Sequence, residues 1–363
     1  MGILNKEPHP GLVLQEKINS MHMSRSELAA RTGVTEKHIS TVINGNKGIS
    51  PAFAKKLAYA FDEQASVWLN LQAKYDAYCA EIEAENNVSD EEKNILHSLK
   101  DVIEYFLEQG IMHNHCGDTE KVLQLRKILC VSNLASVPKI TYNAAYRAQI
   151  KSNTAVNPFV LFAWQRMCEL ETKDIETEGN VSKEKLEAAV PEIKKILLLS
   201  DTHKMLKLLQ GKFAECGIAF KIVHNFPGAP VQGFIKESSD DGQTILCLTL
   251  RRKRMDTLIF TLFHEIAHVL NGDLSVRFVD FTDEKSEMEK NADERARNML
   301  IDPELYRKFV LSRSNYTTES GIEQFAKTAG VRPSVVVGRL QNDGWLEWSQ
   351  FNKYIEKIEC FDL

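Results

Sequence analysis

The chain has 363 residues, more than one typical domain, and its composition of 43% hydrophobic and 26% charged residues is that of a soluble globular protein with two or three domains. A net charge of −5 excludes a protein that coats nucleic acid along its whole length, although a small DNA-reading module remains compatible with it. The sequence has no apolar run of membrane-spanning length, no secretory signal and no C-x-x-C pair among its seven cysteines, so we expect a reduced, cytoplasmic protein without a membrane.

The first predicted elements are short helices over residues 12–70, separated by Gly and Asn turns. Ser24 or Ser26 can cap one helix, Gly33 can supply the positive φ of a tight turn, and Thr35 can cap the next helix. The outer side of that second helix and the loop after it carry residue types that reach base edges and phosphates in a major groove. The predicted DNA-binding residues are Thr35, Glu36, Lys37, His38, Ser40, Thr41, Asn44 and Lys47.

All of these residues except Lys47 lie in the stretch ELAARTGVTEKHISTVINGN, which is preceded by HPGLVLQEKI and followed, after Lys47 and Gly48, by ISPAFAKKLAYAFDEQ. The pattern resembles the XRE-type helix-turn-helix family, and more specifically the HigA-like antitoxins, over about residues 8–78. The resemblance implies binding to palindromic double-stranded operator DNA. The excess of positive charge over residues 22–48 is small, so we expect a homodimer on DNA. The alternative is a helical bundle that mediates only protein contacts.

The next region is helical as well. After a DNA-binding domain over residues 1–78, the sequence predicts a polar helical connector over 79–117 and a helical middle domain over 118–200. We expect Ser89 to cap a helix and Trp164 to lie in the core of the middle domain. The motif MHNHCGD holds two histidines and a cysteine, and we interpret it as a polar loop because no fourth ligand follows at a recognisable spacing.

Three strands are predicted in GIAFKIVHNF, APVQGFIKE and GQTILCLTLRR, with a hairpin turn at Asp240-Asp241-Gly242. Helices resume at Met255 and continue to near the end of the chain. A second stretch that resembles a helix-turn-helix, from Glu323 to Gly344, carries valines where a DNA reader needs polar residues, so we expect it to pack internally. The fold class is therefore mainly α, with an α+β C-terminal half.

The segment TLFHEIAHVLNGD contains the pentad His264-Glu265-x-x-His268. On a helix the two histidines lie on one face and can offer two imidazole nitrogens to one Zn²⁺. Glu265 lies beside them and is the predicted catalytic base, which takes a proton from water and passes it to the leaving amine. The competing interpretation is an ordinary amphipathic helix that happens to carry two histidines.

A catalytic zinc site needs a third protein ligand, and SEMEKNADERARNMLIDP supplies candidates. Glu289 and Asp293 are four residues apart, so Glu289 can bind the metal while Asp293 accepts a hydrogen bond from a ligand histidine in the second shell. Glu287 is a weaker candidate, and Glu294 is expected to be solvated. Without the upstream histidines, Glu289 would be interpreted as a surface carboxylate.

Together, the third strand, the pentad and EKNADERARNMLIDP resemble the ImmA/IrrE metallopeptidase family over about residues 200–345. The resemblance implies a zincin-like metallopeptidase domain over 201–363 with a small sheet. The family commonly has Glu two positions before the Asp, where this chain has Asn291. We expect the strand at 246–250 to form the sheet edge beside the site, where a substrate peptide adds as a further strand. Tyr306, Arg251 and His224 are alternatives for the oxyanion-stabilising residue.

The sequence thus predicts a DNA-binding regulator of the antitoxin or repressor type that carries a zinc-dependent endopeptidase. Its protein substrate would be a repressor, a cognate toxin or the chain itself. The alternative is a non-catalytic antitoxin or autorepressor whose peptidase-like domain serves as a sensor or a toxin-docking surface.

Overall fold

The computed structural model describes residues 7–113, 117–143, 156–237, 242–275 and 287–358. The chain forms two compact units, one made of Met1–Lys93 with His113–Gln124 and the other of Asn94–Met112 with Leu125–Leu363. Within the described residues, no helix is both long enough and apolar enough to cross a membrane.

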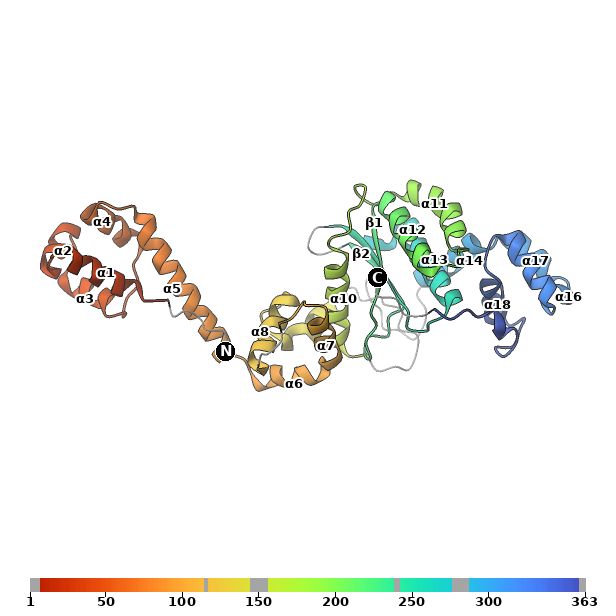
Figure 1. The fold of residues 1–363 in the computed structure, drawn as a ribbon, viewed down its shortest axis with the longest axis horizontal. Helices are drawn as coiled ribbons and strands as arrows, with labels where there is room; N and C mark the ends of the chain where they lie inside the picture. The colour runs from red at the N-terminus through yellow and green to blue at the C-terminus, as the bar shows by residue number, and fades with distance from the viewer. Residues whose placement is uncertain (1–6, 114–116, 144–155, 238–241, 276–286, 359–363) are drawn as a thin grey trace. The chain divides into compact units, whose positions relative to one another are not determined.

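The N-terminal unit begins with a bundle of short helices from which the longer α5 leads away (Figure 1). The helices are α1 (Pro10–Ser20), α2 (Arg25–Thr32), α3 (Glu36–Ile43), α4 (Pro51–Phe61) and α5 (Ala65–Asn86). Ser24 caps α2, Gly33 follows it with φ +61°, and Thr35 caps α3. Leu28, Ile39 and other apolar side chains fill the core between the helices. The predicted helix-turn-helix is confirmed.

Short helices also make up the stretch that follows. They are α6 (Asp90–Ser98), α7 (Lys100–Glu108), α8 (Asp118–Ile128), η1 (Leu134–Ser136), α9 (Val137–Asn143) and α10 (Pro158–Thr172). Ser89 accepts a hydrogen bond from the backbone N–H of Glu92, as expected of a cap. Trp164 is fully buried, as predicted, and its indole donates to the backbone carbonyl of His224. His115 and Cys116 of the MHNHCGD motif lie outside the described residues.

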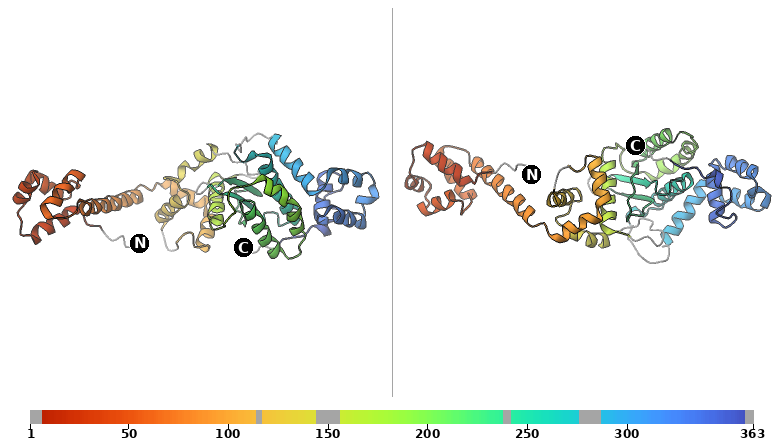
Figure 2. Two further views of the ribbon diagram at one scale, coloured as in Figure 1. Left: turned by 90° about the horizontal axis from the view of Figure 1, so that it is seen from above. Right: turned by 60° about the horizontal axis from the view of Figure 1, so that its bottom comes forward.

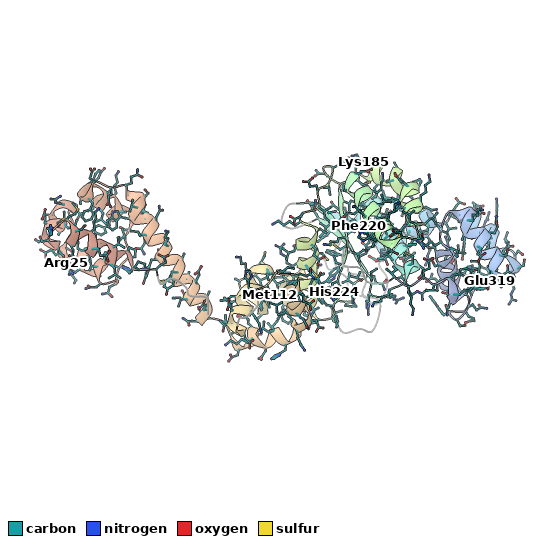
Figure 3. The ribbon with its side chains drawn as sticks, in the orientation of Figure 1. Arg25, Met112, Lys185, Phe220, His224 and Glu319 are labelled. Atoms are coloured by element: carbon teal, nitrogen blue, oxygen red, sulfur yellow. The ribbon has the colours of Figure 1, made fainter. Side chains whose placement is uncertain are left out.

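A three-stranded mixed sheet follows the helices α11 (Lys183–Ile196) and α12 (Thr202–Glu215). Its strands are β1 (Ile218–Val223), β2 (Gly233–Glu237) and β3 (Thr244–Thr249), in the order β1-β3-β2. β3 runs parallel to β1 and antiparallel to β2. Phe220 of β1 (Figure 3) packs its ring 5.1 Å from that of Phe213 in α12, which joins the helix to the sheet.

The prediction that the strand at 246–250 forms the sheet edge is wrong. β3 is the central strand and all six of its residues are buried. Among the described strands, β2 and β1 lie at the edges. The physical reason is that β1 pairs in parallel with the side of β3 that the β2–β3 pairing leaves free. Asp240 and Asp241 of the predicted turn lie outside the described residues.

Helix α13 (Met255–Asn271) carries the pentad and is buried along most of its length. It ends at Gly272, whose φ of +86° permits the left-handed cap. The remaining elements are η2 (Asp273–Ser275), α14 (Glu287–Leu300), α15 (Pro303–Val310), α16 (Arg313–Tyr316), α17 (Glu319–Ala329), α18 (Pro333–Asn342) and η3 (Asn352–Tyr354). The helices α15–α18 gather beyond the end of α14 in both views of Figure 2. Val335, Val336 and Val337 are buried, which confirms internal packing of this stretch.

Candidate functional site

The two histidines of the pentad lie side by side on the buried face of α13. His264 is 1% exposed and His268 is fully buried, as is Glu265 between them. The ring centroids of the two histidines are 4.6 Å apart, with the rings nearly perpendicular. The helical spacing of four residues therefore produces the shared face that the sequence predicted.

The carboxylate of Glu289 in α14 lies close to the Nε2 atoms of both histidines. Its Oε2 lies 3.2 Å from Nε2 of His264 and its Oε1 lies 3.4 Å from Nε2 of His268. The two Nε2 atoms are 3.0 Å from each other. The structure thus brings together the three residues that were predicted as metal ligands, from two helices that pack against each other.

Two aspartates accept hydrogen bonds from the Nδ1 atoms of the imidazoles, the nitrogens opposite the shared point. Nδ1 of His264 lies 2.9 Å from Oδ1 of Asp293, and Nδ1 of His268 lies 2.8 Å from Oδ2 of Asp273. Asp293 was expected from the sequence, but Asp273 was missed. The signal for Asp273 was its place one residue after the helix-ending Gly272, which returns the chain towards the last turn of α13.

This arrangement fits a metal ion. A neutral imidazole that donates from Nδ1 to a carboxylate presents the lone pair of Nε2, and both histidines direct that atom to one point. In a tetrahedral centre with bonds of about 2.0–2.2 Å, neighbouring ligand atoms lie about 3.3 Å apart. The observed separations of 3.0, 3.2 and 3.4 Å match that spacing. The cluster of His264, His268 and Glu289 can therefore hold a metal ion.

The cluster also changes the acidity of its own ligands. Burial lowers the pKa of His264, but the hydrogen bonds to Asp293 and Glu289 and the charge of Glu265 outweigh it and raise the pKa to about 9. Without a metal, the surrounding carboxylates therefore favour a proton on this imidazole, and a cation is the species that this site attracts.

Glu265 lies close to the edge strand β2. A Cβ added to Gly233 would stand 2.8 Å from Oε1 of Glu265 and 2.5 Å from Cγ2 of Thr261. Only a residue without a side chain fits there, so the backbone of β2 approaches the predicted catalytic carboxylate closely.

The neighbouring polar residues of α14 stay outside the cluster. Asn291 is exposed and lies apart from the ligand atoms, so the cluster forms without a glutamate at that position. Glu287 and Glu294 are also exposed, and for Glu294 this confirms the expectation.

The three alternatives for an oxyanion-stabilising residue contact other groups. His224 (Figure 3) stacks against Tyr105 with ring centroids 4.9 Å apart. Arg251 donates to the carbonyl of Pro230, and Tyr306 donates to Asp343. None of these contacts joins the metal cluster, so the choice among the three stays open.

The predicted DNA-binding residues lie on α3 and directly before and after it. Thr35, Glu36, Lys37, Asn44 and Lys47 are exposed, whereas His38, Ser40 and Thr41 are half-buried.

His38 packs edge-on against Phe53, with ring centroids 4.8 Å apart. Burial, then Lys47 and Lys56, lower its pKa, which favours the neutral ring. Arg25, at the start of α2 (Figure 3), donates to Ser40 Oγ at 3.5 Å. The exposed face of α3 is thus flanked by basic side chains from α2 and from the loop after α3.

Comparison with known families identifies the N-terminal helices. A helix-turn-helix family model matches residues 14–68. The chain is 39% identical over 74 residues to virulence-associated protein A' of Dichelobacter nodosus, a match that covers 20% of this chain and 64% of that protein. It is 34% identical over 101 residues to the uncharacterised HTH-type transcriptional regulator YbaQ of Escherichia coli K12, covering 28% of this chain and 84% of that protein.

Among solved structures, the antitoxin HigA of Pseudomonas aeruginosa with the higBA promoter is 29% identical, with a TM-score of 0.21. The match covers 23% of this chain and 97% of that one. No family model matches the C-terminal part of the chain, which carries His264, His268 and Glu289.

Proposed function

Since this chain belongs to the family of helix-turn-helix transcriptional regulators, we propose that it binds operator DNA as a homodimer and carries a zinc-dependent endopeptidase site in its C-terminal unit. The observation that supports the second part most directly is the convergence of three ligand atoms beside a buried glutamate.

DNA recognition follows from the surface of α3. Lys37 and Asn44 are exposed side chains of the kinds that pair with guanine and adenine edges in a major groove. Lys47 lies in the next loop, where a phosphate contact fixes the register of the helix on the duplex. A dimer doubles these contacts and offsets the small excess of positive charge on each head.

Zinc is the metal that this donor set fits best, because two imidazoles and one carboxylate leave an open tetrahedral position. When bound there, zinc supplies a Lewis acid that polarises a peptide carbonyl and the attacking water. Asp293 and Asp273 hold the ligand imidazoles in the required tautomers. Glu265 takes the proton of the water and delivers it to the leaving amine, as its place beside both ligands allows.

The close approach of Gly233 to Glu265 indicates where a substrate peptide would bind. The N-terminal end of β2 passes over Glu265, and β2 lies at an edge of the described sheet. An extended peptide that adds to this edge runs past the catalytic carboxylate. The substrate that we propose is a regulatory protein, either a repressor, a cognate toxin or another copy of this chain.

A second candidate is a non-catalytic regulator in which the metal cluster acts as a sensor or stabilises a docking surface for a toxin. The observation that favours it is the burial of His264, Glu265 and His268, each at most 1% exposed. A structural metal site is closed in this way, whereas a catalytic site keeps one position open.

The peptidase proposal is tested by incubating the zinc-loaded full chain with the products of adjacent genes and with DNA-bound copies of itself. We expect a discrete cleavage that disappears in Glu265→Gln while zinc content stays unchanged, because Glu265 is not a ligand. Glu294→Gln is the matched control and should cleave normally. Equal cleavage by Glu265→Gln, or none by the wild type, would favour the second candidate.

The DNA-binding proposal is tested by titrating the full chain onto the DNA upstream of its own gene at several salt concentrations. Lys47→Ala should weaken binding to all sequences and reduce the slope of log K against log salt by about one per head. Asn44→Ala should lower the preference for operator over unrelated DNA by about 1–3 kcal/mol. Lys74→Ala, on the exposed surface of α5, is the control and should change neither.

A further inference from the structure

A cavity of about 150 Å³ lies one helical turn away from the metal cluster. Its walls come from the first turns of α13, the end of α14, α18 and the segments before β2 and after β3. Phe260 forms part of one wall, and its ring centroid lies 6.4 Å from that of His264. Gln232 forms part of another, and it directly precedes the Gly233 that approaches Glu265. The cavity therefore lies next to the cluster of His264, His268 and Glu289 both along α13 and along the start of β2.

Among the charged residues of the lining, basic side chains are in the majority. Four arginines face the cavity with a single carboxylate, Asp256, and they are Arg252, Arg254, Arg297 and Arg339. Asp256 accepts two hydrogen bonds from Arg254, at 3.1 and 2.7 Å. A Cβ on Gly338 would stand 3.1 Å from Asp256, so the glycine leaves room for this ion pair against α18.

The remaining arginines divide into two kinds. Arg339 lies 3.6 Å from Asp343, stacks on Tyr306 and donates to the carbonyls of Arg297 and Ile301. Arg252 and Arg297 have no ion pair within the described part of the chain. Two positive charges at the cavity are therefore left for a ligand to neutralise.

Gln232 adds an uncharged polar group to the lining. Gln232 is 7% exposed and lines the cavity, and over the described ranges its side chain makes no hydrogen bond to protein. Its amide atoms therefore remain free to donate to or accept from a polar group of a ligand in the cavity. Trp348, which is 63% exposed, adds an apolar wall. The lining thus combines charge, an amide and apolar surface.

The size of the cavity narrows the choice of ligand. One water needs about 10–15 Å³ of such volume, so the cavity holds about ten waters, or one side chain with its nearest backbone. We propose that this cavity is the subsite for an acidic side chain of the polypeptide on which the metal centre acts. The assignment rests on the proposed peptidase function, since the adjoining site is what presents a polypeptide to the cavity.

The test is a calorimetric titration of the full zinc-loaded chain with N-acetyl-glutamate-N-methylamide and with its glutamine counterpart. We expect the glutamate compound to bind, and the glutamine compound to bind about 10- to 100-fold more weakly, because a hydrogen bond to a charged group is lost. Arg297→Gln and Arg252→Gln should each weaken glutamate binding by a similar factor. Both side chains lack an ion pair in the described structure, so these neutral variants should fold normally. Arg313→Gln, an exposed residue outside the cavity, is the matched control.

Three results would overturn the assignment. The first is no binding of the glutamate compound. The second is binding that persists in Arg297→Gln but disappears in His264→Ala, which would place the carboxylate on the metal. The third is tighter binding of free glutarate or phosphate than of the capped glutamate, which would make this a site for a free anion. Because the titration needs no cleavage, absence of peptidase activity together with Arg297-dependent binding would refute only the proposed peptidase function.

Discussion

Two aspartates decide which nitrogen each ligand histidine presents. Asp293 and Asp273 accept from the Nδ1 atoms, so each Nε2 is left for a metal. Asp293 was predictable because it lies four residues after Glu289 on the same helix face. Asp273 could not be found from helical periodicity, because its contact depends on the path of the chain after Gly272; its position after the helix-ending glycine was the available signal.

Removing either aspartate should weaken metal binding without removing a ligand. Asp293→Ala and Asp273→Ala should each lower zinc affinity by about 10- to 100-fold, since outer hydrogen bonds orient the imidazole and raise its basicity. Competition with a chromogenic chelator measures the change. Glu294→Ala, an exposed neighbour on α14, is the control. Wild-type affinity in both aspartate variants would show that the two hydrogen bonds do not support a metal centre.

Metal binding should release a proton. The pKa of His264 is raised from 6.5 to about 9 in the metal-free protein, so below about pH 9 its imidazole is protonated and cannot ligate. Zinc affinity should therefore increase with pH throughout the range below about pH 9 and level off above it. Calorimetry at pH 7.5 in two buffers of different ionisation enthalpy should show release of about one proton per chain from this group. An observed binding enthalpy that is the same in both buffers would contradict the assignment.

Among the elements, α13 and its neighbours could be predicted from sequence more fully than the sheet. The helical spacing of the pentad, the asparagine-glycine stop and the three β-rich segments all agree with the structure. The order of the strands did not follow from the sequence. Placing β3 in the centre requires a parallel pairing with β1, and such non-local pairings leave little trace in local residue patterns.

Gly233 packs the sheet against α13 and offers a test of that packing. Gly233→Ala should lower the free energy of unfolding by about 1–3 kcal/mol, because the new methyl group would overlap Thr261 and Glu265. Gly211→Ala is the matched control. It lies in α12 with open space around its Cβ position, so it should stabilise the protein by about 0.5–1 kcal/mol. Denaturant unfolding of both variants measures the difference. Equal stability of Gly233→Ala and the wild type would contradict the close approach of β2 to Glu265.

At the scale of the whole molecule, a family match describes the N-terminal unit, and the geometry of a side-chain cluster describes the C-terminal unit. The helix-turn-helix family model ends at residue 68, within the N-terminal unit, and identifies a transcriptional regulator. The cluster of His264, His268 and Glu289 belongs to the C-terminal unit, and its capacity to hold a metal ion follows from the distances between its ligand atoms. One chain therefore contains both a helix-turn-helix regulator and a cluster that could hold a metal ion.

The central claim is that His264, His268 and Glu289 form a three-ligand metal centre, and the metal content of the purified full chain tests it most directly. Elemental analysis should find about one zinc per chain in the wild type and in Glu294→Gln. The double variant His264→Ala/His268→Ala should contain almost none, although circular dichroism should show that its helices are retained. Full zinc content in the double variant, or a wild type that binds no metal after equilibration with zinc, would contradict the account.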